Sequence, residues 1–272
     1  MSHRLAIVLV DGLRADVAKD CLGYLSALVL AGRASASEFA CEMPSLSRPL
    51  YATLLTGQPP LEHGVLSNAS RHACSDTWLH RAHALELSSV FVAYHWFFEL
   101  LAGSPFHAEQ HRHAGIHALG VEAASWYYAD EYPDSHVFAD AHALQAAHSP
   151  DLLFVHPMGM DHAGHRFGGQ SVEYRYQARL LDGILATYLP LWQRAGYDII
   201  LTSDHGMGAD RMHGGVAIDE RQVPYFWLPA QTTSSLATPP LPATQLGVRA
   251  FVEHLLEGLA SRAPAARGTS DA

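Results

Sequence analysis

The feature that most constrains the fold of this 272-residue chain is a pattern that occurs three times. A continuous, largely apolar run of strand length leads into acidic or imidazole residues, at residues 5–10, 152–156 and 198–202. Runs of this kind are typical of strands buried on both faces of a parallel sheet. A helical pattern from about residue 14 to residue 30 follows the first run. We therefore predict a single α/β domain with a mostly parallel central sheet that helices flank on both faces.

Candidate metal ligands follow these runs. Asp11 comes directly after the first run, and Asp161 lies shortly after the second. Because the carboxyl ends of parallel strands meet at one crevice, we expect the loops that carry these residues to converge. The candidate set contains three carboxylates and three imidazoles: Asp11, Asp161, Asp204, His165, His205 and His213. This mixture of ligands suits zinc or manganese. An aspartate after a strand can also serve as a helix cap, so Asp11 alone does not decide between the two roles.

Ser47 lies at the predicted start of a helix. Pro49 can occupy a first helical turn, and the helical pattern continues to Gly57. The free N–H groups and the positive end of the dipole at a helix start favour a phosphate group and a serine alkoxide. Ser47 is therefore the candidate nucleophile, and it is preferred over Ser45 because only Ser47 stands two residues before this proline.

Six motifs follow one another along the chain: Val10-Asp11-Gly12, the stretch from Pro44 to Gly57, Glu62-His63-Gly64-Val65, Asp161-x-x-Gly164-His165, Ser203-Asp204-His205-Gly206-Met207 and His213-Gly214-Gly215. In this order they resemble the nucleotide pyrophosphatase/phosphodiesterase branch of the alkaline phosphatase superfamily. The resemblance covers residues 5–68 and 150–228, and it implies an alkaline phosphatase-like catalytic domain over residues 1–260.

The resemblance also implies a role for each candidate residue. One divalent ion, most simply zinc, is held by Asp161, His165 and His213, and a second ion is held by Asp11, Asp204 and His205. Ser47 then attacks phosphorus and forms a phosphoseryl intermediate. The family usually has threonine at this position, and serine is the other common choice in the superfamily.

One departure from the family pattern concerns the binding of phosphate. The resemblance implies an asparagine three residues after the nucleophile, whose side chain helps to hold a phosphate oxygen, but this chain has Leu50 there. A guanidinium group binds phosphate through two hydrogen bonds, so we expect Arg48 to replace the missing contact.

Several reactions remain open with this ligand set. Hydrolysis of a phosphodiester or a nucleotide pyrophosphate is the preferred function, and hydrolysis of a phosphomonoester or a phosphonate is the alternative. A sulfatase is less favoured, because the sequence Ser47-x-Pro49-x-Tyr51 lacks the arginine of the sulfatase motif. A metal-dependent phosphomutase normally needs a large second domain. An inactive binding module is least favoured, because all six candidate ligands and a nucleophile are present.

Composition agrees with an enzyme that acts on a small phosphoester. The chain is 49% hydrophobic and has a formal net charge of −10, which argues against nucleic acid or a membrane as the primary partner. The first strand begins near residue 5 without an apolar leader, and the three cysteines have no paired spacing, so we expect a cytoplasmic protein. The sequence does not indicate an oligomeric state.

The remaining segments are predicted more coarsely. Residues 69–150 separate the two halves of the site, and we expect them to form a variable insert that shapes substrate recognition. Further elements are strands at 89–94 and 223–228, a helix at 171–194 that Pro190 bends or ends, a helix at 244–259 and a loose tail at 261–272.

Most of the 19 histidines are expected to have structural roles. The series His107, His111, His113 and His117 has metal-like spacing but no carboxylates in phase, so we do not interpret it as a metal site. His63 is expected to fix the turn after the nucleophile helix. His156 and His162 flank the Asp161 motif and are left without an assigned role, although either could support a metal ligand.

Overall fold

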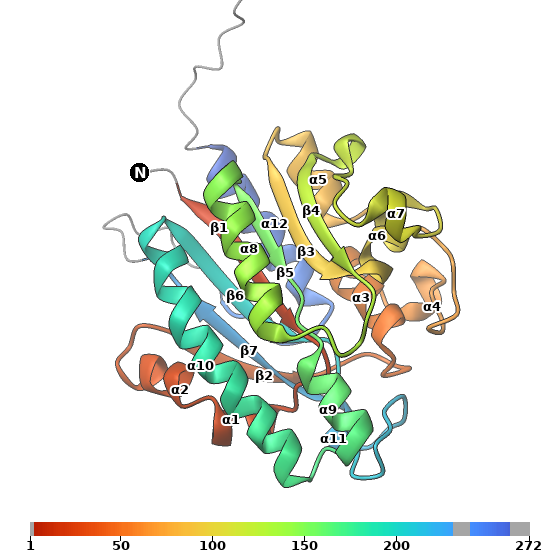
Figure 1. Ribbon diagram of the computed structural model, residues 1–272, viewed down its shortest axis with the longest axis vertical. Helices are drawn as coiled ribbons and strands as arrows, with labels where there is room; N and C mark the ends of the chain where they lie inside the picture. Colours follow the sequence, from red (N-terminus) through yellow and green to blue (C-terminus); the bar gives the residue numbers. More distant parts are fainter. Residues whose placement is uncertain (1–2, 231–239, 262–272) are drawn as a thin grey trace, which may run out of the picture.

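The computed structural model describes residues 3–230 and 240–261. In this part of the chain one sheet with the strand order β2-β7-β6-β1-β5-β3-β4 runs through the molecule (Figure 1). Only β7 runs against its neighbours, because it pairs antiparallel with both β2 and β6, whereas the other pairs are parallel. The strands are β1 (Arg4–Val10), β2 (Ser35–Ala40), β3 (Ser89–Tyr94), β4 (Val121–Tyr127), β5 (Leu152–Val155), β6 (Tyr197–Ser203) and β7 (Gln222–Leu228). The predicted α/β fold with a mostly parallel sheet is confirmed.

Helices cover both faces of the sheet. Alternate residues of β1 face two separate apolar cores, with Ile7 in one core and Val8 in the other. The first core contains side chains of α3 (Ser47–Thr56), α5 (Trp78–Ala84), α6 (His95–Ala102) and α12 (Gly247–Ala260). The second contains side chains of α1 (Ala15–Cys21), α2 (Gly23–Leu30), α8 (Asp134–His148) and α10 (Val172–Arg194), the layer in front in Figure 1.

The remaining helices are short or lie at the end of the sheet. Helix α9 (Gly159–Phe167) follows β5 and lies beyond the carboxyl ends of the strands (Figure 1). Shorter turns of helix are α4 (Pro60–His63), α7 (Ala108–His111), α11 (Ile218–Arg221) and the 3-10 turn His117–Leu119. No helix among the described residues is long and apolar enough to cross a membrane.

Several predicted elements differ from those observed. The helical pattern of residues 14–30 is divided at Leu22, and α10 continues through Pro190 instead of ending there. The predicted strands at 89–94 and 223–228 are β3 and β7. The final helix begins at Gly247, three residues later than predicted. Of the predicted tail, residues 262–272 lie outside the described residues.

The segment 69–150 is part of the central domain. It supplies β3 and β4 to the sheet and α8 to one of the helix layers. Sequence reasoning missed β4 and α8, as well as the polar edge strand β2. The expected role of this segment in substrate recognition stays a prediction, and two of its aromatic residues, Trp126 and Tyr127, are buried in the core.

Candidate metal centre

The site lies where the carboxyl ends of three neighbouring strands meet. Strand β1 runs between β5 and β6, so the residues that follow these strands share one crevice. The chain turns sharply after Asp11 because Gly12 has a φ angle of +71°. A Cβ atom on Gly12 would lie only 2.9 Å from the Cα atom of Asp161. The missing side chain therefore allows α9 to bring Asp161 close to Asp11.

One group of candidate ligands is completely buried. The Nε2 atom of His205 lies 3.4 Å from Oδ1 of Asp11 and 3.3 Å from Oδ2 of Asp204. The other oxygen of Asp204 accepts a hydrogen bond of 3.2 Å from the backbone N–H of Gly12. These three side chains are the group that the resemblance assigned to one ion, and the fold brings them together.

A second group is more open to solvent. Oδ1 of Asp161 lies 3.3 Å from Nε2 of His165 and 3.6 Å from Nε2 of His213. The two imidazole nitrogens are 3.1 Å apart. The side chain of His165 is 42% exposed, whereas Asp161 is buried.

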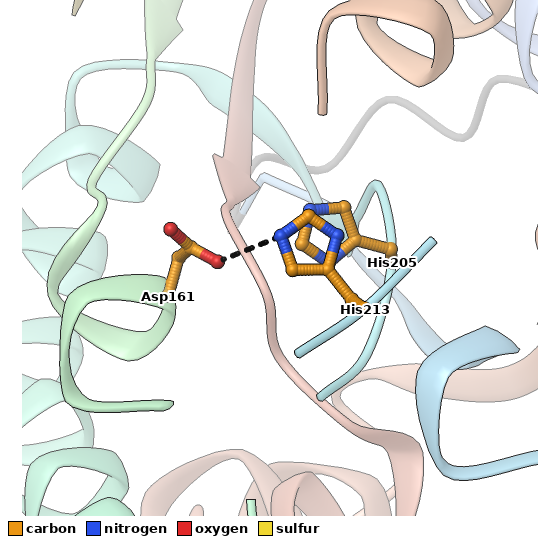
Figure 2. A group of neighbouring side chains, drawn as sticks. All are labelled: Asp161, His205 and His213. Atoms are coloured by element: carbon orange, nitrogen blue, oxygen red, sulfur yellow. Dashed lines mark ion pairs between the residues drawn. The ribbon is translucent and has the colours of Figure 1, made fainter. Parts of the chain in front are cut away.

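His205 also connects the two groups. Its ring stacks on that of His213 with 3.7 Å between centroids, and Asp161 faces both rings from α9 (Figure 2). Asp161, His205 and His213 therefore also form a compact set of candidate ligands. The two groups are consequently neighbours in one centre.

The residues present fit divalent cations. Among the described residues, three buried carboxylate oxygens that face the centre have no hydrogen-bond partner: Asp11 Oδ1, Asp161 Oδ1 and Asp204 Oδ2. Buried polar atoms are rarely left in this state unless a cation or water satisfies them. Four ligands at zinc distances of about 2.0–2.2 Å lie roughly 3.3–3.6 Å from one another in a tetrahedron. The spacings of 3.1–3.6 Å within each group are close to this value.

The three histidines are oriented as metal ligands usually are. Their Nδ1 atoms lie near backbone carbonyl oxygens, at 2.8 Å for His205, 3.0 Å for His165 and 2.7 Å for His213. An Nδ1–H group that donates to a carbonyl leaves the lone pair on Nε2 free to bind a cation. In all three rings it is the Nε2 atom that faces the carboxylates.

The pKa values of the buried acidic and imidazole side chains also indicate that this centre suits bound cations. Burial raises the pKa of Asp161 and Asp204 well above the usual range, and the charge of Asp11 raises both further. Burial opposes ionisation of Asp11 as well, but contacts with His156 and His205 outweigh it and lower that pKa to about 2. Burial lowers the pKa of His213 to about 3, so this ring is neutral at neutral pH. Burial also lowers the pKa of His205, so His205 and His213 supply little positive charge to the three buried carboxyl groups.

Ser47 is adjacent to the buried group. It is the first residue of α3, it is buried, and its Oγ atom lies 3.1 Å from Nε2 of His205. Ser45 has a different environment, because its hydroxyl donates to the carbonyl of Gly215 and accepts from the N–H of Gly214. Ser45 therefore shapes the loop that carries His213, whereas Ser47 faces the centre.

The structure does not support the phosphate contact that we expected of Arg48. Its guanidinium is buried, donates to Glu99 at 2.6 Å and to the carbonyl of Ser70 at 2.9 Å, and lies over the ring of Trp96. Both terminal nitrogens thus have protein acceptors. Leu50, which stands where the family pattern has asparagine, is buried in the protein interior.

Some supporting residues were missed by sequence reasoning. The side-chain oxygen of Asn68 accepts a hydrogen bond of 3.0 Å from the backbone N–H of Arg48, which places this amide at the start of α3. The hydroxyl of Tyr51 donates to Oδ2 of Asp11. Gln245 donates to the backbone carbonyl of Asp204 at 2.8 Å. No local pattern marks these residues, although Tyr51 follows Ser47 by one helical turn.

The structure also shows the surroundings of three histidines outside the candidate ligand set, His63, His156 and His162. His63 joins α3 to the turn that follows it, because Nε2 lies 3.0 Å from Oγ1 of Thr53 and Nδ1 accepts from the N–H of Val65. This confirms the predicted role of His63. His156, left unassigned, lies 3.4 Å from Asp11, whereas His162 lines a groove to which none of the candidate ligands contributes.

The fold is that of an alkaline phosphatase-like α/β domain. A family model described as type I phosphodiesterase/nucleotide pyrophosphatase matches residues 5–221, and the chain belongs to this family. The resemblance inferred from the motifs is thereby confirmed.

The individual proteins that this chain is similar to share less than a quarter of its residues over the matched regions. The catalytic subunit of human GPI ethanolamine phosphate transferase 2 is 23% identical over 235 residues, which cover 81% of this chain and 23% of that protein. Murine ectonucleotide pyrophosphatase/phosphodiesterase 5 has a similar fold, with a TM-score of 0.59, 17% identity, and coverage of 76% of this chain and 58% of that one. Phosphonoacetate hydrolase from Sinorhizobium meliloti 1021, bound to phosphonoacetate, also has a similar fold. Its TM-score is 0.56 at 20% identity, and the match covers 75% of this chain and 56% of that one. The chain thus spans less than two thirds of each of these relatives.

Proposed function

We propose that this protein is a metal-dependent phosphoesterase that hydrolyses a phosphodiester or a nucleotide pyrophosphate through a phosphoserine on Ser47. The observation that carries the proposal is the position of the Ser47 hydroxyl. Its oxygen lies 3.1 Å from His205 Nε2, the same nitrogen that faces Asp11 and Asp204. The hydroxyl is therefore next to the Asp11/Asp204/His205 group, at the start of a ten-residue helix.

The centre is suited to a substrate that carries negative charge. Two divalent ions, zinc or manganese, held by Asp11, Asp204 and His205 and by Asp161, His165 and His213 would supply the positive charge that lowers the pKa of a hydroxyl and stabilises a phosphoryl group. The residues of the chain hold the reacting groups in place. Ser47 Oγ attacks phosphorus as the bond to one ester oxygen breaks, and the leaving oxygen departs as an alcohol or a phosphate with the serine proton. Water then cleaves the seryl ester, which returns the proton to Ser47 and releases a phosphomonoester that keeps the other ester group.

Asn68 is the residue best placed to hold a phosphate oxygen beside Ser47. Its carbonyl oxygen accepts from the backbone N–H of Arg48, so its amide group is fixed next to the nucleophile with two N–H donors. This is the function that we had expected of Arg48. The replacement Asn68→Ala should therefore raise KM or lower kcat without loss of metal.

Transfer to an alcohol is a second candidate. A phosphoserine can be attacked by an alcohol as well as by water, and the human relative that matches 81% of this chain is named as an ethanolamine phosphate transferase. Release of phosphorylated alcohol in the presence of ethanolamine or glycerol would distinguish transfer from hydrolysis.

The test combines a substrate screen with trapping of the intermediate. Protein loaded with zinc or manganese is assayed with bis-p-nitrophenyl phosphate, thymidine monophosphate p-nitrophenyl ester, p-nitrophenyl phosphate, phosphonoacetate and p-nitrophenyl sulfate. We expect the two diesters to be the best substrates. Acid quenching with a labelled diester should leave label on the peptide that contains Ser47, and Ser47→Ala should keep both metals but lose activity. Label on Ser45, or full activity of Ser47→Ala, would contradict the proposal.

A further inference from the structure

The carboxylate of Asp11 has two oxygens in different environments. Oδ1 faces Nε2 of His205 at 3.4 Å and has no hydrogen-bond partner among the residues that the structure describes. Oδ2 is contacted by the hydroxyl of Tyr51 and lies 3.4 Å from Nε2 of His156. The carboxylate is thus held by one oxygen, while the other is directed at the centre.

Tyr51 connects this carboxylate to the nucleophile helix. It lies four residues after Ser47 on α3, so both side chains are on the same face of the helix. Its ring is fully buried and stacks on Phe97 with 4.4 Å between centroids. Because the ring cannot move freely, the hydroxyl fixes the distance between α3 and the Asp11 carboxylate.

His156 holds the same oxygen from another element. It follows β5 directly, and its backbone N–H donates to the carbonyl of Val92 on β3 at 2.9 Å. Its ring is fully buried and packs edge-on against Tyr51, at 5.0 Å between centroids. Its Nδ1 atom lies 3.3 Å from the hydroxyl of Tyr127. Among the described residues Nε2 has no hydrogen-bond partner, and it lies 3.4 Å from Oδ2 of Asp11.

The complete burial of the His156 ring beside Asp11 calls for an explanation. Burial of a polar ring is unfavourable unless its nitrogens contact polar groups, and this ring packs against the aromatic rings of Tyr51 and Phe97. An outer partner that holds one oxygen of a ligating carboxylate fixes the direction of the other oxygen, which increases metal affinity. The geometry around Asp11 has this form, with a phenol and an imidazole from two different elements on one oxygen.

We propose that Tyr51 and His156 are positioning residues that hold Asp11 so that its Oδ1 atom is presented to a cation beside Ser47. This inference rests on the proposed metal centre. It assigns to His156 and Tyr51 a selective effect on the Asp11/Asp204/His205 group, with no effect on the Asp161/His165/His213 group.

The test measures metal affinity separately from activity. Metal-free protein is titrated with zinc in competition with a chromophoric chelator, and the sites are distinguished by repeating the titration in an Asp161→Asn background. His156→Phe and Tyr51→Phe should weaken zinc binding at the Asp11 group by about 10–100-fold and leave the other site unchanged. His156→Gln, whose amide can reach the same oxygen, should restore much of the affinity.

Matched controls identify general packing effects. Tyr225 is a buried tyrosine whose hydroxyl has no hydrogen-bond partner among the described residues, so Tyr225→Phe should leave both affinities unchanged. His142→Phe tests the same exchange on α8, away from the centre. If His156→Phe fails to fold, Tyr51→Phe, which removes only a hydroxyl, carries the test.

Two results would overturn the inference. One is unchanged zinc affinity in Tyr51→Phe and His156→Phe, and the other is equal weakening at both sites, which would indicate a structural effect only. Failure of the proposed function gives a different result, because the wild-type protein would then bind no zinc tightly at either site.

Discussion

The two halves of the candidate centre differ in how they are built. Asp11, Asp204 and His205 follow directly after strands β1 and β6, are completely buried, and are held by contacts from α3, β5 and the chain before α12. Asp161 and His165 come from α9, and His213 comes from a loop. His165 is 42% exposed. Under the proposed function, we expect the buried half to hold Ser47 in place and substrate and solvent to reach the other half past His165.

Loss of a ligand in the buried half should have the largest effect. Asp204→Ala removes a carboxylate that water cannot replace easily, because the site is closed. We expect kcat/KM with a phosphodiester to fall by more than the roughly 100-fold that loss of an outer partner costs. Steady-state kinetics at saturating zinc measure this. Asp182→Asn is the control, since the carboxylate of Asp182 accepts backbone N–H groups at the start of α2, among them that of Tyr24. Near-wild-type turnover in Asp204→Ala would refute the assignment.

Loss of a ligand in the open half should have a smaller effect. His165→Ala exposes a position that water can fill, so zinc affinity at this half should fall by about 10–100-fold and excess zinc should restore part of the activity. His162→Ala is the matched control, because His162 lies on the same helix but lines a groove to which none of the candidate ligands contributes. If His165→Ala lost as much activity as Asp204→Ala and zinc restored none of it, the distinction between the halves would be wrong.

Metal binding should depend on pH through the carboxylates. The pKa values of Asp161 and Asp204 are raised by burial and by the charge of Asp11, so the metal-free centre retains protons above the usual carboxyl range. A cation must displace these protons, and its affinity should therefore fall as the pH falls, by about tenfold per pH unit for each proton displaced. Calorimetry in buffers of different ionisation enthalpy would show proton release. An affinity independent of pH between 5 and 7 would contradict the expected protonation.

Replacement of Arg48 should have the smallest effect on catalysis. Arg48→Met leaves the buried carboxylate of Glu99 without its closest partner, so the free energy of unfolding should fall by about 1–3 kcal/mol. Kinetic constants of the folded protein should change by about twofold or less, since the guanidinium is directed at Glu99. Denaturant unfolding and steady-state kinetics on the same preparation test both statements. A large rise in KM with an unchanged free energy of unfolding would instead support the phosphate contact predicted for Arg48 from the sequence.

Sequence reasoning succeeded where the pattern is local. The runs before Asp11, Asp161 and Asp204 indicated buried parallel strands, and the carboxyl ends of such strands must meet. The spacing of the motifs then placed the candidate ligands in one centre, and the structure brings them together in two groups in which the imidazole nitrogens lie 3.3–3.6 Å from the carboxylate oxygens.

Prediction from sequence failed where a contact joins residues that are far apart in the chain. Arg48 pairs with Glu99, 51 residues away, and no local signal distinguishes that pairing from a phosphate contact. The link between Tyr51 and Asp11 joins a helix to a strand end. Edge strand β2 was missed because its residues are mostly exposed and polar, so it lacks the apolar run that marked the central strands.

The most direct test of the account is the number of metal ions per chain. Wild-type protein equilibrated with zinc, freed of excess metal by gel filtration and analysed for its metal content should contain two ions per chain. His165→Ala, treated in the same way, should retain one ion, held by Asp11, Asp204 and His205. A wild-type content of one ion or none, or a content that is unchanged in both His165→Ala and His205→Ala, would contradict the two-site centre.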